Sequence, residues 1–148
     1  MTVKRKNKHI FVFGIFAVDI SFYVDKKVKA GETIIAKGSN IGPGGKASNQ
    51  AISARKLGGN TTLITRLGND NFNSYANTIW SKEKLSTSAK IDRALPTGMA
   101  GIFIDDKTGE NSVIVHPGAS AQLSVKDFNS QKSKMQNGDI FLTQFEQS

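Results

Sequence analysis

The chain contains a glycine-rich run, Gly44-Gly45-Lys46-Ala47-Ser48-Asn49-Gln50-Ala51, which is followed by glycines at positions 58 and 68 and leaves few choices for the local backbone. Glycine lets the backbone turn sharply and approach a ligand, and the helix that follows begins with amides that lack partners. Such a junction binds polar or anionic groups. Because Lys46, Asn49 and Gln50 add side-chain donors, the run predicts a loop-to-helix junction that binds a hydroxyl-rich molecule.

Two shorter glycine motifs match part of this run. A P-loop is excluded, because it needs glycine and then Ser or Thr at the positions of Asn40 and Ala47. A Rossmann fingerprint, G-x-G-x-x-A, fits residues 42–47, with Asp70 as the downstream acid. It should follow a buried parallel strand, whereas the polar residues of 33–41 are typical of a partly solvated strand. A nicotinamide-binding domain stays open as a third functional hypothesis.

The length and composition of the chain suit one globular domain. Its 148 residues are 38% hydrophobic, which is enough to form a single core. The absence of cysteine excludes disulfides, thiolate nucleophiles and cysteine-bound metals, and it fits a reducing compartment. We therefore expect a cytoplasmic protein. The two histidines are too few for a histidine cluster.

The N-terminus is basic. Four of the positive charges behind the net charge of +8 belong to Lys4, Arg5, Lys6 and Lys8, and the others are dispersed along the chain. We therefore expect a solvated arm and no nucleic-acid partner. A signal peptide is an open alternative, because the apolar run 10–18 follows this arm. That run is far shorter than the roughly 18 residues of a membrane span, so we expect no membrane association.

Hydrophobic periodicity predicts an alternation of strands and helices. We expect strands at 10–16, 21–24, 33–41, 61–67, 98–105, 111–116 and 139–144, and helices at 47–57, 71–84 and 125–135. Capping signals support these ranges: Asp70, the pair Ser124 and Asp127, and Gly58 flank helices, and Gly109 lies in a hairpin turn. The order of elements favours an α/β domain with a mostly parallel sheet.

The spacing of the glycine-rich run, Gly58 and Gly68 resembles the first signature of the ribokinase-like (PfkB) carbohydrate kinases, and it is most similar to the ribokinase branch of that family. The resemblance covers nearly the whole chain. The other segments that carry it are 11–14 together with Asp19, and residues 30–33, 97–100, 116–121 and 142–146. It implies that residues 1–148 are the N-terminal part of a ribokinase-like three-layer αβα domain with a small β-sheet lid. The lid would comprise 21–24, 33–41, 98–105 and 111–116, and two lids would pair in a homodimer.

The resemblance also implies ATP-dependent phosphorylation of a sugar hydroxyl, on ribose or a related pentose, with Mg²⁺ and a monovalent cation such as K⁺. The substrate-binding residues carried over by position are Asp19, Gly44, Gly45, Lys46, Asn49 and Glu146. Asp19 would accept hydrogen bonds from the sugar at the C-terminal end of the first strand, and Gly45, Lys46 and Asn49 would donate them. Glu146 would lie near the sugar and the phosphate and metal region.

Two departures from the family pattern qualify this interpretation. Ala17 stands where the ribokinase branch usually has asparagine, so the choice of sugar or of a sugar-like acceptor such as a nucleoside stays open. The catalytic base of the family is the aspartate of a Gly-Ala-Gly-Asp motif, and no aspartate of this chain stands in that motif. We therefore expect a sugar-binding half that does not transfer phosphate alone. A truncated, non-catalytic sugar-binding or dimerisation protein is the alternative.

Overall fold

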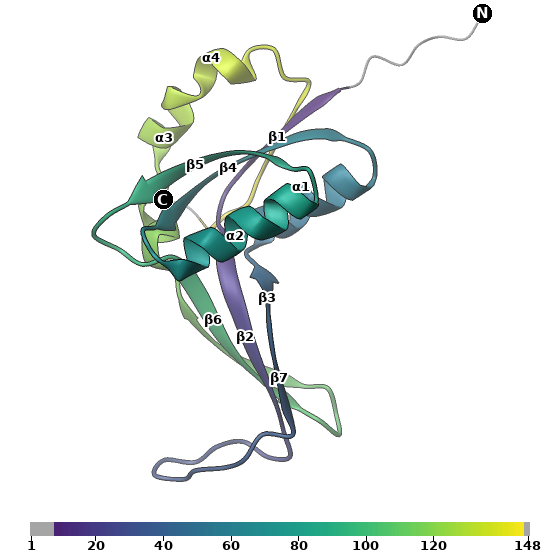
Figure 1. The fold of residues 1–148 in the computed structure, drawn as a ribbon, viewed down its shortest axis with the longest axis vertical. Coiled ribbons are helices and arrows are strands. Elements are labelled where there is room, and N and C mark those ends of the chain that lie inside the picture. The colour runs from purple at the N-terminus through teal and green to yellow at the C-terminus, as the bar shows by residue number, and fades with distance from the viewer. Residues whose placement is uncertain (1–7, 147–148) are drawn as a thin grey trace, which may run out of the picture.

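The strands form two four-stranded sheets in the computed structural model, which describes residues 8–146 (Figure 1). In the main sheet all neighbours are parallel, in the order β5 (Ser86–Asp92), β4 (Asn60–Gly68), β1 (His9–Phe13) and β8 (Ile140–Thr143). The second sheet has the order β3 (Gly38–Gly44), β2 (Ala17–Val24), β6 (Gly98–Asp105) and β7 (Asn111–His116). Its β2–β6 pair is parallel and its other pairs are antiparallel.

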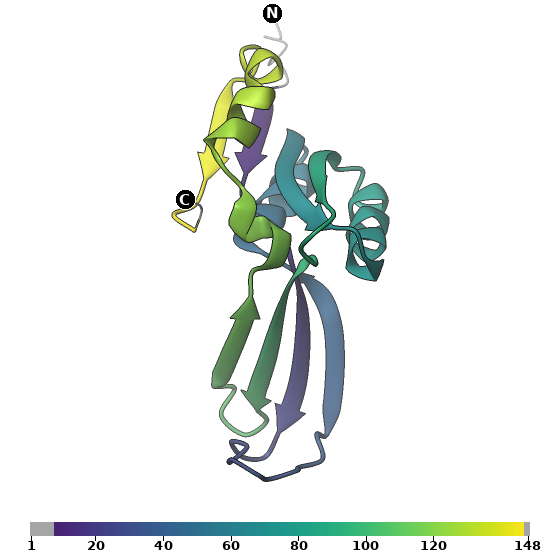
Figure 2. The same cartoon turned by 90° about the vertical axis from the view of Figure 1, so that its left-hand side faces the viewer.

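Helices cover both faces of the main sheet, as Figure 2 shows. One face is covered by α1 (Lys46–Lys56) and α2 (Asn71–Lys82), and the other by η1 (Gly118–Gln122), α3 (Val125–Ser130) and α4 (Lys132–Met135). The core beneath α1 and α2 includes Val12, Phe16, Leu63, Leu67 and Trp80. The core on the opposite face includes Phe11, Phe13, Ile64 and Leu123, with Phe128 and Met135 packed against it. The expected three-layer α/β arrangement with a second, small sheet is confirmed.

The alternation of side chains along β4 explains how one strand serves both cores. Successive side chains of a strand point to opposite faces of a sheet. Leu63 and Leu67 therefore contribute to the core beneath α1 and α2, while Ile64 contributes to the core beneath α3. Arg66 shares the α3 side with Ile64 and binds Asp127 of α3 there.

The second sheet extends away from the main sheet (Figure 2). The predicted hairpin is confirmed as β6 and β7, but other predicted bounds were wrong: the first strand ends at Phe13, β2 already begins at Ala17, and β3 covers Gly38–Gly44 rather than 33–41. The reason is that Phe16, Ala17 and Val18 are buried where the two sheets meet. The apolar run is therefore continuous and does not show where the first strand ends.

Two further elements differ from the sequence prediction. Strand β5 was not predicted, because most of its residues are polar and exposed at the edge of the main sheet, where it pairs with β4. The helix predicted at 125–135 is divided into α3 and α4 at Gln131, whose φ of −107° and ψ of 0° are not helical. Periodicity alone does not report such a local break.

The predicted caps and turns are confirmed. Asp70 accepts a hydrogen bond from the Asn73 amide at the start of α2, and Ser124 and Asp127 form a capping box at α3. Gly58 and Gly109 have positive φ, as their positions required. Within residues 8–146 no helix is long and apolar enough to cross a membrane. Most of the expected basic arm lies outside the described residues.

Candidate functional site

The glycine junction connects the last residue of β3 with the first turn of α1. Gly45 is the N-cap of α1 and has a φ of +83°. A Cβ atom on Gly45 would lie 2.6 Å from the Ile15 carbonyl oxygen and from the Phe16 Cα. Both the backbone angle and this close approach to the β1–β2 connection therefore require glycine. The junction is held against the point where the chain passes from the main sheet to the second sheet.

The first turn of α1 presents backbone donors that no group of the described chain satisfies. The Ser48 amide bonds the Ile15 carbonyl at 3.3 Å, and the Asn49 amide bonds the Gly45 carbonyl at 3.0 Å. No acceptor within residues 8–146 bonds the amides of Lys46 and Ala47. The first turn also contains no acidic residue. This helix terminus therefore retains hydrogen-bonding capacity and a partial positive charge for a polar ligand.

Asp19 lies directly against the glycine junction. It is the third residue of β2, where it is opposite Gly42 of β3 and Ala100 of β6. A Cβ atom on Gly44 would overlap its carboxylate. Partial burial raises the pKa of Asp19, and no donor in the described part of the chain bonds it. The expectation that Asp19 ends the first strand was wrong, because the chain crosses into the second sheet before reaching it.

The C-terminal segment reaches the same junction from the main sheet. Glu146 follows β8 and forms an ion pair with the Nζ of Lys46. The Gln144 side chain donates to the Gln50 side chain at 2.6 Å. These contacts join segments that are about a hundred residues apart in the sequence, because β8 is parallel to β1 and ends beside the start of α1. The Gln144 contact was not predicted, since no local pattern signals it.

The structure therefore brings the predicted residues to one place. Asp19 lies against Gly44, Gly45 caps α1, and Lys46 meets Glu146. Asn49 lies on α1 within one turn of Gly45, with an exposed side chain. Acceptors and donors thus share one open surface at the start of α1, where Lys46, Asn49 and Glu146 are exposed. This arrangement suits a ligand that carries several hydroxyl groups.

Asp70 has a structural role that sequence reasoning recognised in part. Besides capping α2, its carboxylate accepts from the amide and the hydroxyl of Thr97, at 2.7 and 2.8 Å. Burial acts to raise the pKa of Asp70, but these hydrogen bonds outweigh it and lower the pKa. The glycine run follows the antiparallel strand β3 rather than a buried parallel strand. The Rossmann interpretation is therefore wrong. The strand before the glycines is not a buried parallel strand, and the carboxylate of Asp70 is occupied by Asn73 and Thr97.

Comparison with protein families gives a match over almost the whole chain. Residues 7–144 match the model of the pfkB family of carbohydrate kinases. The ribokinase of Dictyostelium discoideum is 38% identical over 143 residues, which are 95% of this chain and 44% of that protein. The deoxyribokinase of Salmonella typhi is 31% identical over 140 residues, which are 93% of this chain and 45% of that protein. The chain thus spans less than half the length of these curated relatives.

A solved structure shows the same fold over part of its chain. The Arabidopsis thaliana ribokinase complexed with ribose and ATP superposes with a TM-score of 0.82 at 27% sequence identity. The superposition covers 97% of this chain and 47% of that one. The two sheets and the helices that cover them therefore correspond to slightly less than half of that chain.

Proposed function

The chain belongs to the pfkB family of carbohydrate kinases, and from that premise we propose that it supplies the sugar-binding half of an ATP-dependent sugar kinase. The observation that carries this proposal is the convergence of Asp19, the glycine junction, Lys46 and Glu146 on one open surface. The residues come from both sheets and from both ends of the chain.

Each polar group of this surface has a role in holding a sugar. The Asp19 carboxylate accepts hydrogen bonds from sugar hydroxyls. These hydroxyls supply the hydrogen-bond donors that the described part of the protein does not offer it. The amides at the start of α1 and the side chains of Lys46 and Asn49 donate to sugar oxygens. Glu146 orients Lys46 and lies where a hydroxyl of the bound sugar faces the phosphoryl donor. Orientation of that hydroxyl is the contribution of this half to the reaction.

Ribose or a related pentose is the proposed acceptor. The relatives named above are a ribokinase and a deoxyribokinase, and the solved relative holds ribose and ATP. Ala17 is 7% exposed and has no side-chain donor or acceptor. We therefore expect the site to tolerate loss of one sugar hydroxyl better than a site with asparagine at that position, because no buried amide is left unpaired.

ATP is the proposed phosphoryl donor of the whole protein, with Mg²⁺ and a monovalent cation such as K⁺. Within residues 8–146 no group of three or more His, Cys, Asp or Glu side chains is placed to hold a metal ion. The described residues therefore do not by themselves supply a metal site. The cysteine-free composition suits a reducing compartment, and we propose the cytoplasm.

Self-association through the second sheet is proposed as well. Val113, Ile114 and Val115 of the edge strand β7 are 49%, 69% and 58% exposed. Because successive side chains point to opposite faces of a sheet, β7 exposes apolar side chains on both faces, and such an uncovered edge strand favours pairing with another copy. This surface also supports the second candidate function, a non-catalytic sugar-binding or dimerisation protein. Sugar binding without ATP binding in the whole gene product would favour that candidate.

Ribose binding by the chain tests the proposed function. Trp80 is the single tryptophan, and its indole donates to the Ser48 hydroxyl in the first turn of α1 at 3.2 Å. Its fluorescence therefore reports on the junction, and calorimetry gives the affinity independently. We expect saturable ribose binding and a roughly tenfold or greater loss of affinity in Lys46→Met, because a charged hydrogen bond is lost.

Lys56→Met is the matched control, because Lys56 is also an exposed lysine of α1 and pairs with Glu83 at 3.2 Å, at the opposite end of the helix. It should bind ribose like the unaltered chain. Equal losses in the two variants, or no ribose binding by the unaltered chain, would contradict the proposal. Saturable binding of NADH instead would revive the nicotinamide hypothesis.

A further inference from the structure

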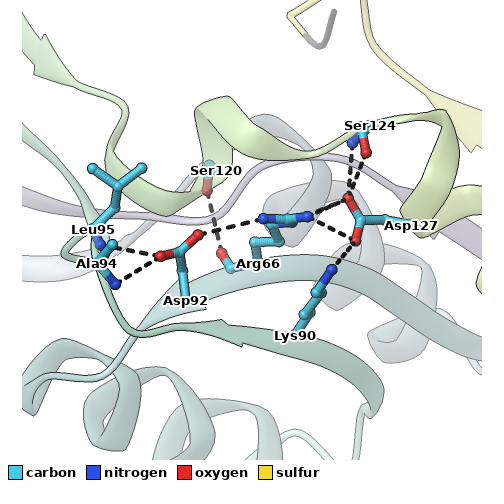
Figure 3. A network of polar contacts seen from close by, with 8 residues as sticks. All are labelled: Arg66, Lys90, Asp92, Ala94, Leu95, Ser120, Ser124 and Asp127. Carbon is cyan, nitrogen blue, oxygen red and sulfur yellow. Dashed lines mark hydrogen bonds and ion pairs between the residues drawn. The ribbon is translucent and has the colours of Figure 1, made fainter.

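Four charged side chains form an electrically neutral group on the α3 side of the main sheet (Figure 3). Three of them, Arg66, Asp92 and Asp127, are largely buried, and Lys90 is about half exposed. Arg66 of β4 forks onto Asp127 of α3, with an Nε–Oδ2 distance of 3.0 Å and an Nη2–Oδ1 distance of 3.1 Å. Its Nη1 lies 3.4 Å from Oδ2 of Asp92, the last residue of β5. The Nζ of Lys90 lies 3.2 Å from Oδ1 of Asp127. These four residues are the Arg66 network.

Both carboxylates of the Arg66 network also bind connecting segments of the chain. Asp127 accepts from the amide and the hydroxyl of Ser124, at 3.0 and 2.9 Å, just before α3. Oδ1 of Asp92 accepts from the amides of Ala94 and Leu95, at 2.9 and 3.1 Å, just after β5. The chain leaves the main sheet for the second sheet at the Asp92 turn and returns from it before Ser124. We call the segment after Asp92 the outgoing connection and the segment before Ser124 the returning connection. The Arg66 side chain therefore joins these two connections between the sheets.

The outgoing connection leads to the strand beside Asp19. Thr97 is fully buried, and its hydroxyl accepts from the Gly68 amide at 3.0 Å. Gly98 follows as the first residue of β6 and pairs with Ala17, and Ala100 pairs with Asp19. Asp92 holds the turn at Ala94 and Leu95, and β6 begins shortly after this turn. The position of the turn therefore determines the position of β6 beside Asp19.

The returning connection leads to the back of the glycine junction. The hydroxyl of Ser120 in η1 donates to the Phe16 carbonyl at 2.9 Å and lies 3.4 Å from the Arg66 carbonyl. Phe16 Cα is one of the atoms that a Cβ on Gly45 would meet at 2.6 Å. The Arg66 side chain is thus linked through Asp92 to the connection that leads to the Asp19 strand. The main-chain carbonyl of Arg66 is linked through Ser120 to Phe16, behind Gly45, and Arg66 contacts neither Asp19 nor Gly45.

We propose that Arg66 is a positioning residue of the sugar site. It holds β6 and Phe16 at the spacing at which Asp19 and the free amides of α1 face the same ligand. A lysine would keep the charge but would not serve, because only the planar guanidinium forks onto Asp127 and reaches Asp92 at once. The proposal rests on the proposed sugar-binding function and adds a residue that none of the site's own contacts would identify.

The first test compares Arg66→Lys with Arg55→Lys in the 148-residue chain. Arg55 is a half-buried arginine of α1 whose Nε donates to the Lys84 carbonyl at 2.9 Å, so the same substitution there leaves the Arg66 network intact. Ribose affinity is measured by calorimetry, well below the unfolding temperature of each variant. We expect Arg66→Lys to weaken ribose binding roughly tenfold, because small displacements of a site reduce its fit to the ligand. Arg55→Lys should bind ribose like the unaltered chain.

The second measurement separates positioning from a loss of stability. Amide resonances of Gly45 and Ser48 in ribose-free protein should shift in Arg66→Lys and stay unchanged in Arg55→Lys. Unchanged resonances together with an unchanged ribose affinity would overturn the proposal. If the unaltered chain binds no ribose, the proposed function fails, and these resonances alone then decide whether Arg66 positions the junction.

If Arg66→Lys does not fold, the variant Asp92→Asn tests whether the Arg66 network positions the site. Asparagine keeps an oxygen that accepts from Ala94 and Leu95, but it removes the charge that faces Arg66. We expect weaker ribose binding and a shifted Gly45 amide in this variant as well. An Asp92→Asn protein with both properties unchanged would show that the link from Arg66 to the outgoing connection does not position the site.

Discussion

At the scale of single residues, Gly45 and Gly58 separate two reasons for glycine. Both have positive φ, +83° and +88°, but a Cβ on Gly58 would meet no atom within 4 Å, whereas one on Gly45 would collide with the backbone of Ile15 and Phe16. Gly58 is therefore required for its backbone angle alone. Gly45 is required for its angle and for the space that it leaves.

Alanine at each position should show this difference. We expect Gly58→Ala to lower the free energy of unfolding by about 1 kcal/mol, the cost of the left-handed backbone conformation. Gly45→Ala should cost about 3 kcal/mol, because backbone atoms must also move. Only Gly45→Ala should abolish ribose binding. Urea unfolding and calorimetry give both quantities, and equal effects of the two variants would show that close packing at the junction is unimportant.

At the scale of elements, α3 depends on its surroundings. It has six residues, too few for stability in isolation, since short helices are marginal in water. Its start is held by the capping box of Ser124 and Asp127 and by the fork from Arg66. Burial acts to raise the pKa of Asp127, but hydrogen bonds from Arg66, Ser124 and Lys90 outweigh it and lower the pKa. The ionised carboxylate is thus the form that stabilises this part of the fold.

Asp127→Asn should remove that stabilisation at neutral pH. We expect a loss of about 3 kcal/mol in the free energy of unfolding, because Arg66 loses the partner of a buried ion pair. The lowered pKa means that the contribution of Asp127 is complete above the unfolded-state pKa of about 3.9 and is lost as the pH falls through the folded-state pKa. The difference between the unaltered chain and Asp127→Asn should therefore shrink below about pH 4.

Asp25→Asn is the control for this prediction. Asp25 pairs with Lys37 at 2.7 Å, but both side chains are about half exposed, so its loss should cost less than about 1 kcal/mol. Urea unfolding of the three proteins at neutral and acidic pH makes the comparison. A difference for Asp127→Asn that persists unchanged at pH 3 would contradict the assigned ionisation.

At the scale of the whole molecule, two apolar surfaces remain uncovered. One is β7 of the second sheet, and the other is β8, where Ile140, Phe141 and Leu142 are 40%, 45% and 37% exposed at the edge of the main sheet. An open edge with apolar side chains favours pairing with further chain. The surface proposed to bind the sugar adjoins both sheets, since Glu146 follows β8 and Asp19 lies in β2.

We expect this 148-residue chain to bind ribose without phosphorylating it. Orientation of the sugar lowers only part of the barrier, and the chain has no Gly-Ala-Gly-Asp base to remove the hydroxyl proton. Incubation with ribose, ATP, Mg²⁺ and K⁺, followed by detection of phosphorylated sugar, tests this expectation. Steady turnover that disappears with Asp19→Asn would contradict it, and turnover unaffected by that substitution would indicate a contaminating kinase.

Features that depend on neighbouring residues could be predicted from the sequence. Periodicity predicted α1, α2 and the β6–β7 hairpin, local polar residues predicted the caps at Asp70 and Ser124, and the glycine run predicted the junction. These signals are legible because helix turns, caps and hairpins are made within a few residues.

The contacts between distant segments could not be predicted from local patterns and follow from the tertiary fold. This fold placed the polar strand β5 at the sheet edge, moved Asp19 into the second sheet, brought Glu146 to Lys46 and joined Arg66 to Asp92 and Asp127. None of these arrangements has a local signal, because each depends on strand order and on the packing of helices over both faces of the sheet. Local patterns thus define the parts of the site, and the pairing of parallel strands brings them together.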